Sequence, residues 1–196
     1  MAFRKPRDYD DVKVGDFRIL PAGGYVCKII KAEETQSKTG KDMIKFAFDI
    51  CEGEYEGYFA QQFKDRKASA DDPTEVKWPF AGTKWVLVFN EDGSTKRDFK
   101  SLCTALIDSG TNVWKPSGND EVFDTNSLKD SKIGIIFRRE EHEYQGASSW
   151  RTVPWGFRSV KAIEEGSFKV PEDKPLPSLQ LTPTDSFEAL EEDLPF

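Results

Sequence analysis

The segment from Met43 to Cys51 alternates strictly between large apolar residues and other side chains. Every second position carries a large apolar group: Ile44, Phe46, Phe48 and Ile50. Successive side chains of a β-strand point to opposite faces, so these four groups would share one face. The pattern therefore predicts a strand whose apolar face covers the core of a β-rich domain.

Runs of β-branched and aromatic residues predict further strands on both sides of this segment. They lie at residues 24–32, 58–64, 84–89, 132–139 and 150–162. The polar, proline-containing stretch 65–80 is expected to be a loop or insertion.

One helix is expected before the last two strands. Its apolar residues recur at the spacing of an amphipathic helix: Phe99, Leu102, Cys103, Leu106 and Ile107. Ser94 or Thr95 is a candidate cap for its start, and Gly110 for its end. The chain order predicts an all-β domain with one helix, arranged as an OB-fold, a five-stranded Greek-key barrel.

Negative charge is concentrated toward the C-terminal end. The formal net charge is −7, and residues 171–196 hold seven acids and one base, a charge of −6. Residues 1–170 therefore carry 27 bases and 28 acids. Five prolines and few large apolar groups make the C-terminal segment typical of disordered chain. We expect a lead-in at residues 1–20, the OB-fold domain at 21–170 and a disordered acidic tail at 171–196.

Other sequence features limit the function classes. The three cysteines, Cys27, Cys51 and Cys103, are scattered, which favours a reducing compartment over a disulfide framework or zinc site. The single histidine, His142, lies in a charged stretch, which argues against nucleophilic catalysis. The sequence shows no apolar run of membrane-spanning length and no signal peptide. No enzyme activity, cofactor, metal or membrane partner is expected.

The C-terminal residues resemble the tip of bacterial single-stranded-DNA-binding proteins, which end in acids, an aliphatic residue, Pro and Phe. The residues that carry this resemblance are Glu191, Glu192, Asp193, Leu194, Pro195 and Phe196. A terminal Phe fills an apolar pocket while its carboxylate and the preceding acids pair with a basic rim. The resemblance implies that the tail recruits replication and recombination proteins.

The body is similar to single-stranded-DNA-binding proteins encoded by phages. The similarity rests on residues 21–33 and 38–46, the expected helix, residues 131–141 and residues 155–160. It implies an OB-fold protein that coats single-stranded DNA in phage DNA replication, recombination or repair. It also implies that the protein acts in the cytoplasm of a bacterial host. A homo-oligomer is expected, and a dimer is the favoured state.

Non-specific binding of single strands needs cations that follow the phosphates and exposed rings that stack on bases. Two basic regions offer such groups: the first two strands with their turn, and the final hairpin. The candidate DNA-binding residues are Lys28, Lys31, Lys38, Lys41, Lys45, Tyr58, Arg138, Arg139, Trp150, Arg151, Trp155, Arg158 and Lys161. Trp150 is the preferred stacking residue, because it lies outside any apolar run. The acidic tail is expected to compete with DNA for the same cations.

Two other functions are consistent with parts of the sequence. Asp71, Asp72 and Glu75 with Lys77 resemble a metal-dependent nuclease site, although all lie in one polar loop. The near-neutral body also allows an adaptor or inhibitor that captures host replication and repair factors with its tail and does not bind DNA. DNA titration separates the adaptor from the DNA-binding protein.

Overall fold

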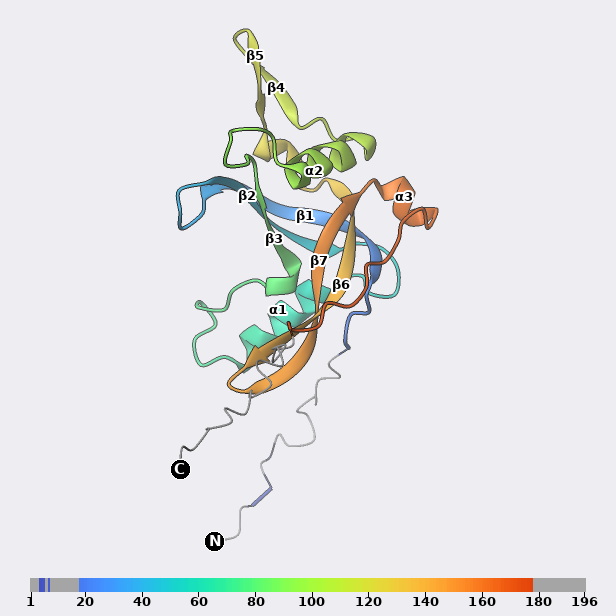
Figure 1. The fold of residues 1–196 in the computed structure, drawn as a ribbon. Coiled ribbons are helices and arrows are strands. Elements are labelled where there is room, and N and C mark those ends of the chain that lie inside the picture. Colours follow the sequence, from blue (N-terminus) through green and yellow to red (C-terminus); the bar gives the residue numbers. More distant parts are fainter. Residues whose placement is uncertain (1–3, 6, 8–17, 178–196) are drawn as a thin grey trace, which may run out of the picture.

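The fold is built on one five-stranded antiparallel sheet (Figure 1). The computed structural model describes residues 4, 5, 7 and 18–177. The strands are β1 (Gly23–Gln36), β2 (Asp42–Ile50), β3 (Thr83–Leu87), β6 (Lys132–Tyr144) and β7 (Ala147–Arg158). Their order in the sheet is β3-β2-β1-β6-β7. The predicted β-rich fold is therefore confirmed.

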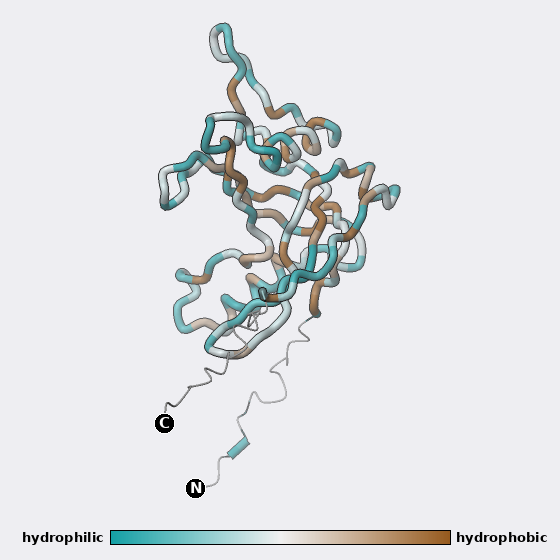
Figure 2. Tube along the Cα trace, viewed as in Figure 1, coloured by the Kyte–Doolittle hydropathy of each residue, from teal (hydrophilic) through white to brown (hydrophobic). Residues whose placement is uncertain are grey.

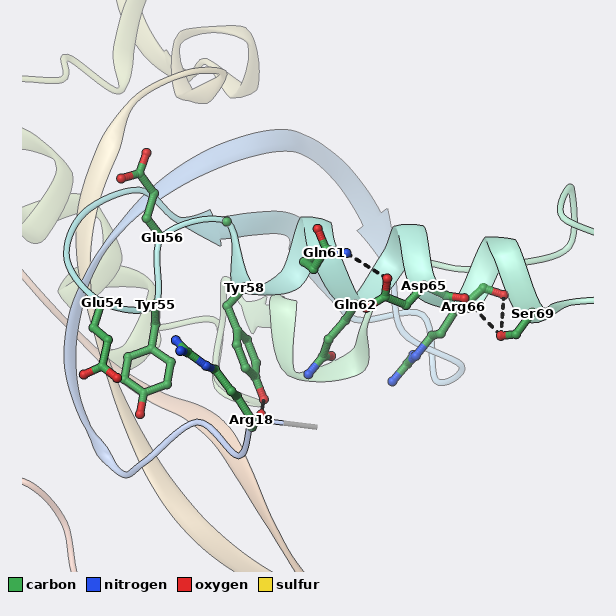
Figure 3. Close-up of a pocket in the computed structure, with 11 residues that line it drawn as sticks. Arg18, Glu54, Tyr55, Glu56, Tyr58, Gln61, Gln62, Asp65, Arg66 and Ser69 are labelled. Atoms are coloured by element: carbon green, nitrogen blue, oxygen red, sulfur yellow. Dashed lines mark hydrogen bonds between the residues drawn. The ribbon is translucent and has the colours of Figure 1, made fainter. Parts of the chain in front are cut away.

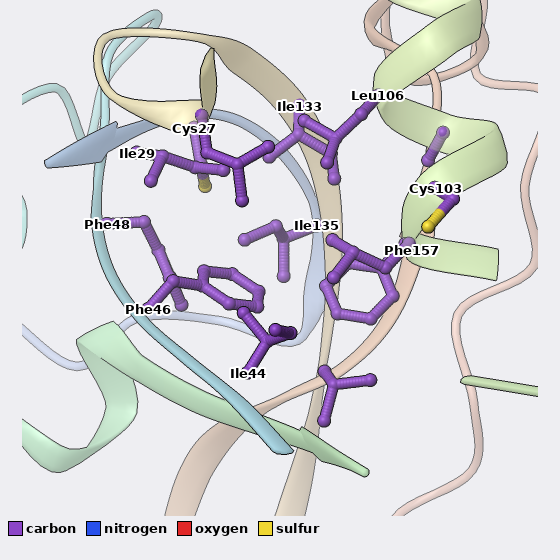
Figure 4. Close-up of a cluster of buried hydrophobic side chains, with 14 of the residues drawn as sticks. Cys27, Ile29, Ile44, Phe46, Phe48, Cys103, Leu106, Ile133, Ile135 and Phe157 are labelled. Atoms are coloured by element: carbon purple, nitrogen blue, oxygen red, sulfur yellow. The ribbon is translucent and has the colours of Figure 1, made fainter. Parts of the chain in front are cut away.

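The alternating segment is β2, and its apolar face lies in the core as predicted. Ile44, Phe46, Phe48 and Ile50 are all buried. Figure 4 shows Ile44, Phe46 and Phe48 in one cluster with Ile135 of β6 and Phe157 of β7. Figure 2 shows the same arrangement along the trace, with hydrophobic segments inside and hydrophilic turns outside.

The sheet is not closed into a barrel. Its edge strands are β3 and β7, and each has one hydrogen-bonded neighbour in the sheet order. The predicted barrel would require β3 to pair with β7, and the sheet formed by the described residues has no such ladder of backbone hydrogen bonds.

The predicted strand at residues 58–64 is wrong, because this segment begins the helix α1 (Tyr58–Ser69). The helix starts after Gly57, whose φ of 74° is left-handed. The buried Asp49 carboxylate on β2 accepts the N–H groups of Phe59 (2.8 Å) and Ala60 (3.1 Å). An acid from a neighbouring strand therefore satisfies the free donors at the helix N-terminus.

The predicted helix after β3 is present as α2 (Arg97–Asp108). Four of the five predicted apolar residues are buried, whereas Ile107 is 46% exposed. Its N-cap is Lys96, which makes no side-chain cap, so the predicted Ser94 or Thr95 cap is wrong. Gly110 follows the helix with a φ of 89°, as its predicted C-terminal role requires.

The prediction of a single helix is also wrong. Besides α1 and α2, the described residues include α3 (Val160–Glu164) and two short 3-10 turns, η1 (Phe80–Gly82) and η2 (Thr125–Leu128). A separate hairpin of β4 (Trp114–Ser117) and β5 (Asp120–Phe123) projects beyond α2 (Figure 1). In the described part of the chain, no helix is long and apolar enough to cross a membrane.

The first residues of the predicted acidic tail pack against the sheet. Residues 171–177 are described, and the Lys174 amide donates to Arg139 O (2.9 Å), while the Glu141 amide donates to Lys174 O (2.8 Å). The pairing of β6 with β1 ends at Phe137. The tail residues therefore bond to the part of β6 that β1 does not cover. The remainder of the predicted tail, with the tip Glu191–Phe196, lies outside the described residues, as does most of the lead-in.

Candidate nucleic-acid interface

A row of three side chains crosses the outward face of β1, β2 and β3. Glu33 is directly opposite Lys45, and Lys45 is directly opposite Trp85. Neighbouring strands lie about 4.8 Å apart, so the three groups are next to one another. The indole of Trp85 is 42% exposed. The row therefore presents an acid, a base and an open aromatic ring on one surface.

A second ring extends this surface toward the end of the sheet. Phe80 of η1 is 55% exposed, and its ring centroid lies 5.7 Å from that of Trp85, with the planes 35° apart. The guanidinium carbon of Arg151 on β7 lies 5.1 Å from the Phe80 ring centroid. We call Lys31, Lys45, Trp85, Phe80 and Arg151 the basic–aromatic track. It combines cations and stacking faces, as single-strand binding requires.

Glu33 moderates the positive charge of the track. Its Oε2 accepts from Lys31 Nζ at 2.7 Å, and its Oε1 accepts from Lys45 Nζ at 2.9 Å. These hydrogen bonds, from Lys31 first and from Lys45 second, lower the pKa of the Glu33 carboxyl below its usual value. The two lysines therefore share one ionised carboxylate at neutral pH.

The turn between β1 and β2 carries two more of the predicted cations, Lys38 and Lys41, both exposed. Lys41 Nζ pairs with Glu91 Oε1 at 2.8 Å. The turn is ordered around Ser37, whose hydroxyl accepts from the amides of Thr39 and Lys41. It joins the two strands that provide Lys31 and Lys45.

The far half of the β6–β7 hairpin holds a separate group of predicted residues. The guanidinium carbon of Arg139 lies 5.0 Å from the ring centroid of Trp150, which is 41% exposed. Arg139 also pairs with Asp173 at 3.3 Å, and Arg138 Nε donates to Glu140 Oε1 at 3.0 Å. The predicted stacking residue is therefore partly covered by an arginine that the acidic segment holds.

The structure does not bring the other predicted residues into the track. Lys28 is paired in register with Asp49 and Lys132, far along β1 from its turn. Arg158 and Lys161 lie at the α3 end of β7 (Figure 1). Lys161 pairs there with Glu165 at 3.7 Å.

Trp155 is 42% exposed in β7, where the register with β6 shifts. Its carbonyl, rather than its ring, makes the contact that matters for the fold. Lys84 Nζ on β3 donates to Pro154 O and Trp155 O, both at 3.1 Å. The ammonium also lies 5.5 Å from the Phe157 ring centroid, and burial lowers the pKa of Lys84. One lysine thus joins the two edges of the open sheet.

Tyr58 is part of a different surface feature, a pocket of about 350 Å³ beside α1 (Figure 3). Its hydroxyl donates to Arg18 O at 2.7 Å and accepts from the Leu20 amide at 3.2 Å. The charged residues that line the pocket are two bases and three acids: Arg18, Arg66, Glu54, Glu56 and Asp65. The lining carries a net negative charge, and the two hydrogen bonds of Tyr58 hold the segment before β1. The structure places Tyr58 outside the track, and its contact with DNA stays a prediction.

One acid of the nuclease hypothesis, Asp72, makes local hydrogen bonds. Asp72 Oδ1 accepts from the amide of Thr74 at 2.8 Å and from its hydroxyl at 2.6 Å, which forms a tight turn. Among the residues that the structure describes, no group of three or more His, Cys, Asp or Glu side chains could hold a metal ion.

The two rings of the track, Phe80 and Trp85, are not among the predicted DNA-binding residues. Val86 faces the core opposite Ile44, so its neighbour Trp85 faces outward. Phe80 ends the stretch 65–80 that is expected to be a loop, and in the structure it begins η1.

Residues 7–77 match the model of a family described as "Protein of unknown function (DUF669)". No curated protein matches the chain. The matched segment includes β1, β2 and α1, with Lys31, Glu33 and Lys45, and it ends before Phe80 and Trp85.

Proposed function

We propose that the protein binds single-stranded DNA through the basic–aromatic track. The observation that carries this proposal is the exposed Phe80–Trp85 pair, flanked by Lys45 on one side and Arg151 on the other. Aromatic faces stack on any base, and the flanking cations follow the phosphates. Such a surface accepts a single strand of any sequence and cannot stack on the bases of an intact duplex.

The sheet order supports an OB-type assignment. Joining β3 to β7 would close the five strands into a barrel with α2 between the third and fourth of them. OB-folds bind oligonucleotides on their second and third strands and on the loops at either end of that face. In this chain that face carries Lys45 and Trp85, with the β1–β2 turn at one end.

The cellular role follows from the resemblance of the sequence. We infer that the protein coats single-stranded DNA during phage replication, recombination or repair in the cytoplasm of a bacterial host. The tip Glu191–Phe196 would recruit partner proteins. The acidic segment would compete with DNA, and the Asp173–Arg139 pair supports this because it occupies a predicted DNA-binding cation.

Removal of residues 178–196 should therefore tighten DNA binding at low salt, and Asp173→Asn should do so to a smaller extent. Equal affinities of the full-length and truncated proteins would refute the competition.

A titration with labelled oligothymidine and an equal-length duplex, followed by the anisotropy of the label at two salt concentrations, tests the main proposal. Trp85→Ala should weaken single-strand binding by about 5- to 150-fold, the loss of one stacked base. Trp155→Ala is the matched control, because it removes an indole of equal exposure outside the track. No binding by wild type, or equal losses in the two variants, would contradict the proposal.

The adaptor function is the second candidate, and the ion pairs favour it. Acids already pair with Lys41, Arg138, Arg139 and Lys161, and Glu33 holds two more lysines. A surface neutralised in this way attracts phosphates less strongly. The same titration decides, because an adaptor would not bind either oligonucleotide even at low salt.

A further inference from the structure

Glu33 lies among the cations that the track would offer to a phosphate. Each of its carboxylate oxygens is bound by one ammonium group, Oε2 by Lys31 and Oε1 by Lys45. Lys45 separates it from Trp85 in the cross-strand row. A nucleotide stacked on Trp85 would therefore bring its phosphate to ammonium groups that already have an anionic partner.

A carboxylate beside a phosphate opposes binding. The three side chains retain between 36% and 71% of their exposed area, so solvent screens the interaction strongly. Two like charges about 5 Å apart in a water-like dielectric repel by an amount equal to roughly a 3- to 10-fold loss in affinity. The lowered pKa of Glu33 keeps this charge present at neutral pH.

We propose that Glu33 sets the affinity of the single-strand interface by competing with DNA phosphate for Lys31 and Lys45. This inference rests on the proposed function and adds a regulating residue to the same site. The competition lowers the affinity of the track for single-stranded DNA below the value that its cations alone would give. Bound strands therefore dissociate faster.

The neighbouring residue provides a matched control. Glu34 is an exposed glutamate that follows the half-buried Glu33, and it is paired in register with the core residue Ile44, so it belongs to the opposite face of β1. Glu34→Gln changes the net charge by the same amount as Glu33→Gln. A difference between the two variants therefore reports position rather than total charge.

The experiment is a salt series of oligothymidine titrations with wild type, Glu33→Gln and Glu34→Gln. Glu33→Gln should bind about 3- to 10-fold more tightly at low salt. Its plot of log affinity against log salt should steepen by about 0.7 for each additional phosphate that the protein neutralises. Glu34→Gln should stay within about twofold of wild type. Unchanged or weaker binding by Glu33→Gln, or an equal increase in affinity in Glu34→Gln, would overturn the inference.

A double-mutant cycle identifies the ammonium group involved. Lys45→Gln should cost more affinity in the Glu33→Gln background than in wild type, because the freed lysine then serves phosphate alone. Equal costs would show that Glu33 does not act through Lys45. Wild type that fails to bind at low salt would overturn the proposed function, whereas binding by wild type without tighter binding by Glu33→Gln would overturn only this inference.

Discussion

Lys84 joins the two edges of the open sheet, and Lys84→Met measures what that contact contributes. Methionine keeps an unbranched apolar side chain near Phe157 and removes both hydrogen bonds to β7. Each bond from a charged donor contributes about 1.5–3 kcal/mol, but burial of the ammonium offsets part of this. We expect the free energy of unfolding to fall by about 2 kcal/mol, which corresponds to about 4–8 °C in Tm for a chain of this size.

Denaturant unfolding and amide hydrogen exchange provide the assay. The amides of β3 should exchange faster in Lys84→Met, whereas Lys64→Met, at an exposed position of α1, should change neither stability nor exchange. Full stability of Lys84→Met with unchanged protection of β3 would refute the reasoning.

A pH series adds an independent check. Burial lowers the pKa of Lys84 in the folded protein below its usual value of 10.5. The unfolded chain therefore holds this proton more tightly, so the stability of wild type relative to Lys84→Met should rise as the pH rises through that window to above 10.5. A stability difference between the two proteins that does not change with pH would contradict this.

Substitutions at three further positions test the interior. Phe59→Ala empties a fully buried position and should cost about 3–5 kcal/mol in denaturant unfolding. Asp49→Ala removes the acceptor for the first N–H groups of α1 and should cost about 1–2 kcal/mol, measured in the same way. Because burial raises the pKa of Asp49, the stability of wild type relative to Asp49→Asn should fall as the pH rises through the acid range. Gly134→Ala would place a Cβ 2.9 Å from the carbonyls of Arg158 and Ser159, so Tm should drop by several degrees.

Strict patterns in the sequence predicted the parts of the fold that depend on one local rule. Alternation from Ile44 to Ile50 predicted β2 and its buried face, because a strand has a fixed period of two. The spacing of the apolar residues from Phe99 to Leu106 predicted α2, because a helix has a fixed period of about 3.6 residues.

Long-range contacts decided the segments that the sequence did not predict. Tyr58, Phe59 and Phe63 favoured a strand by type, but the following Gln, Lys and Arg residues are good helix formers. Asp49, on the preceding strand β2, then caps the helix that they form. The periodicity of neighbouring residues does not reveal this contact, because Asp49 and Phe59 are ten residues apart.

The track has a similar origin, because it spans both edges of a sheet that no backbone ladder joins. Phe80 and Trp85 lie on the β3 side, Arg151 lies on β7, and Lys84 bridges the two. A strand of DNA that contacts both β3 and β7 would favour the arrangement in which Lys84 holds these two strands together. DNA binding and the Lys84 contact should therefore be thermodynamically linked. Lys84→Met should therefore weaken oligothymidine binding, and oligothymidine should slow amide exchange in β3 of wild type. DNA affinity that is unaffected by Lys84→Met would show that the track is positioned without the bridge.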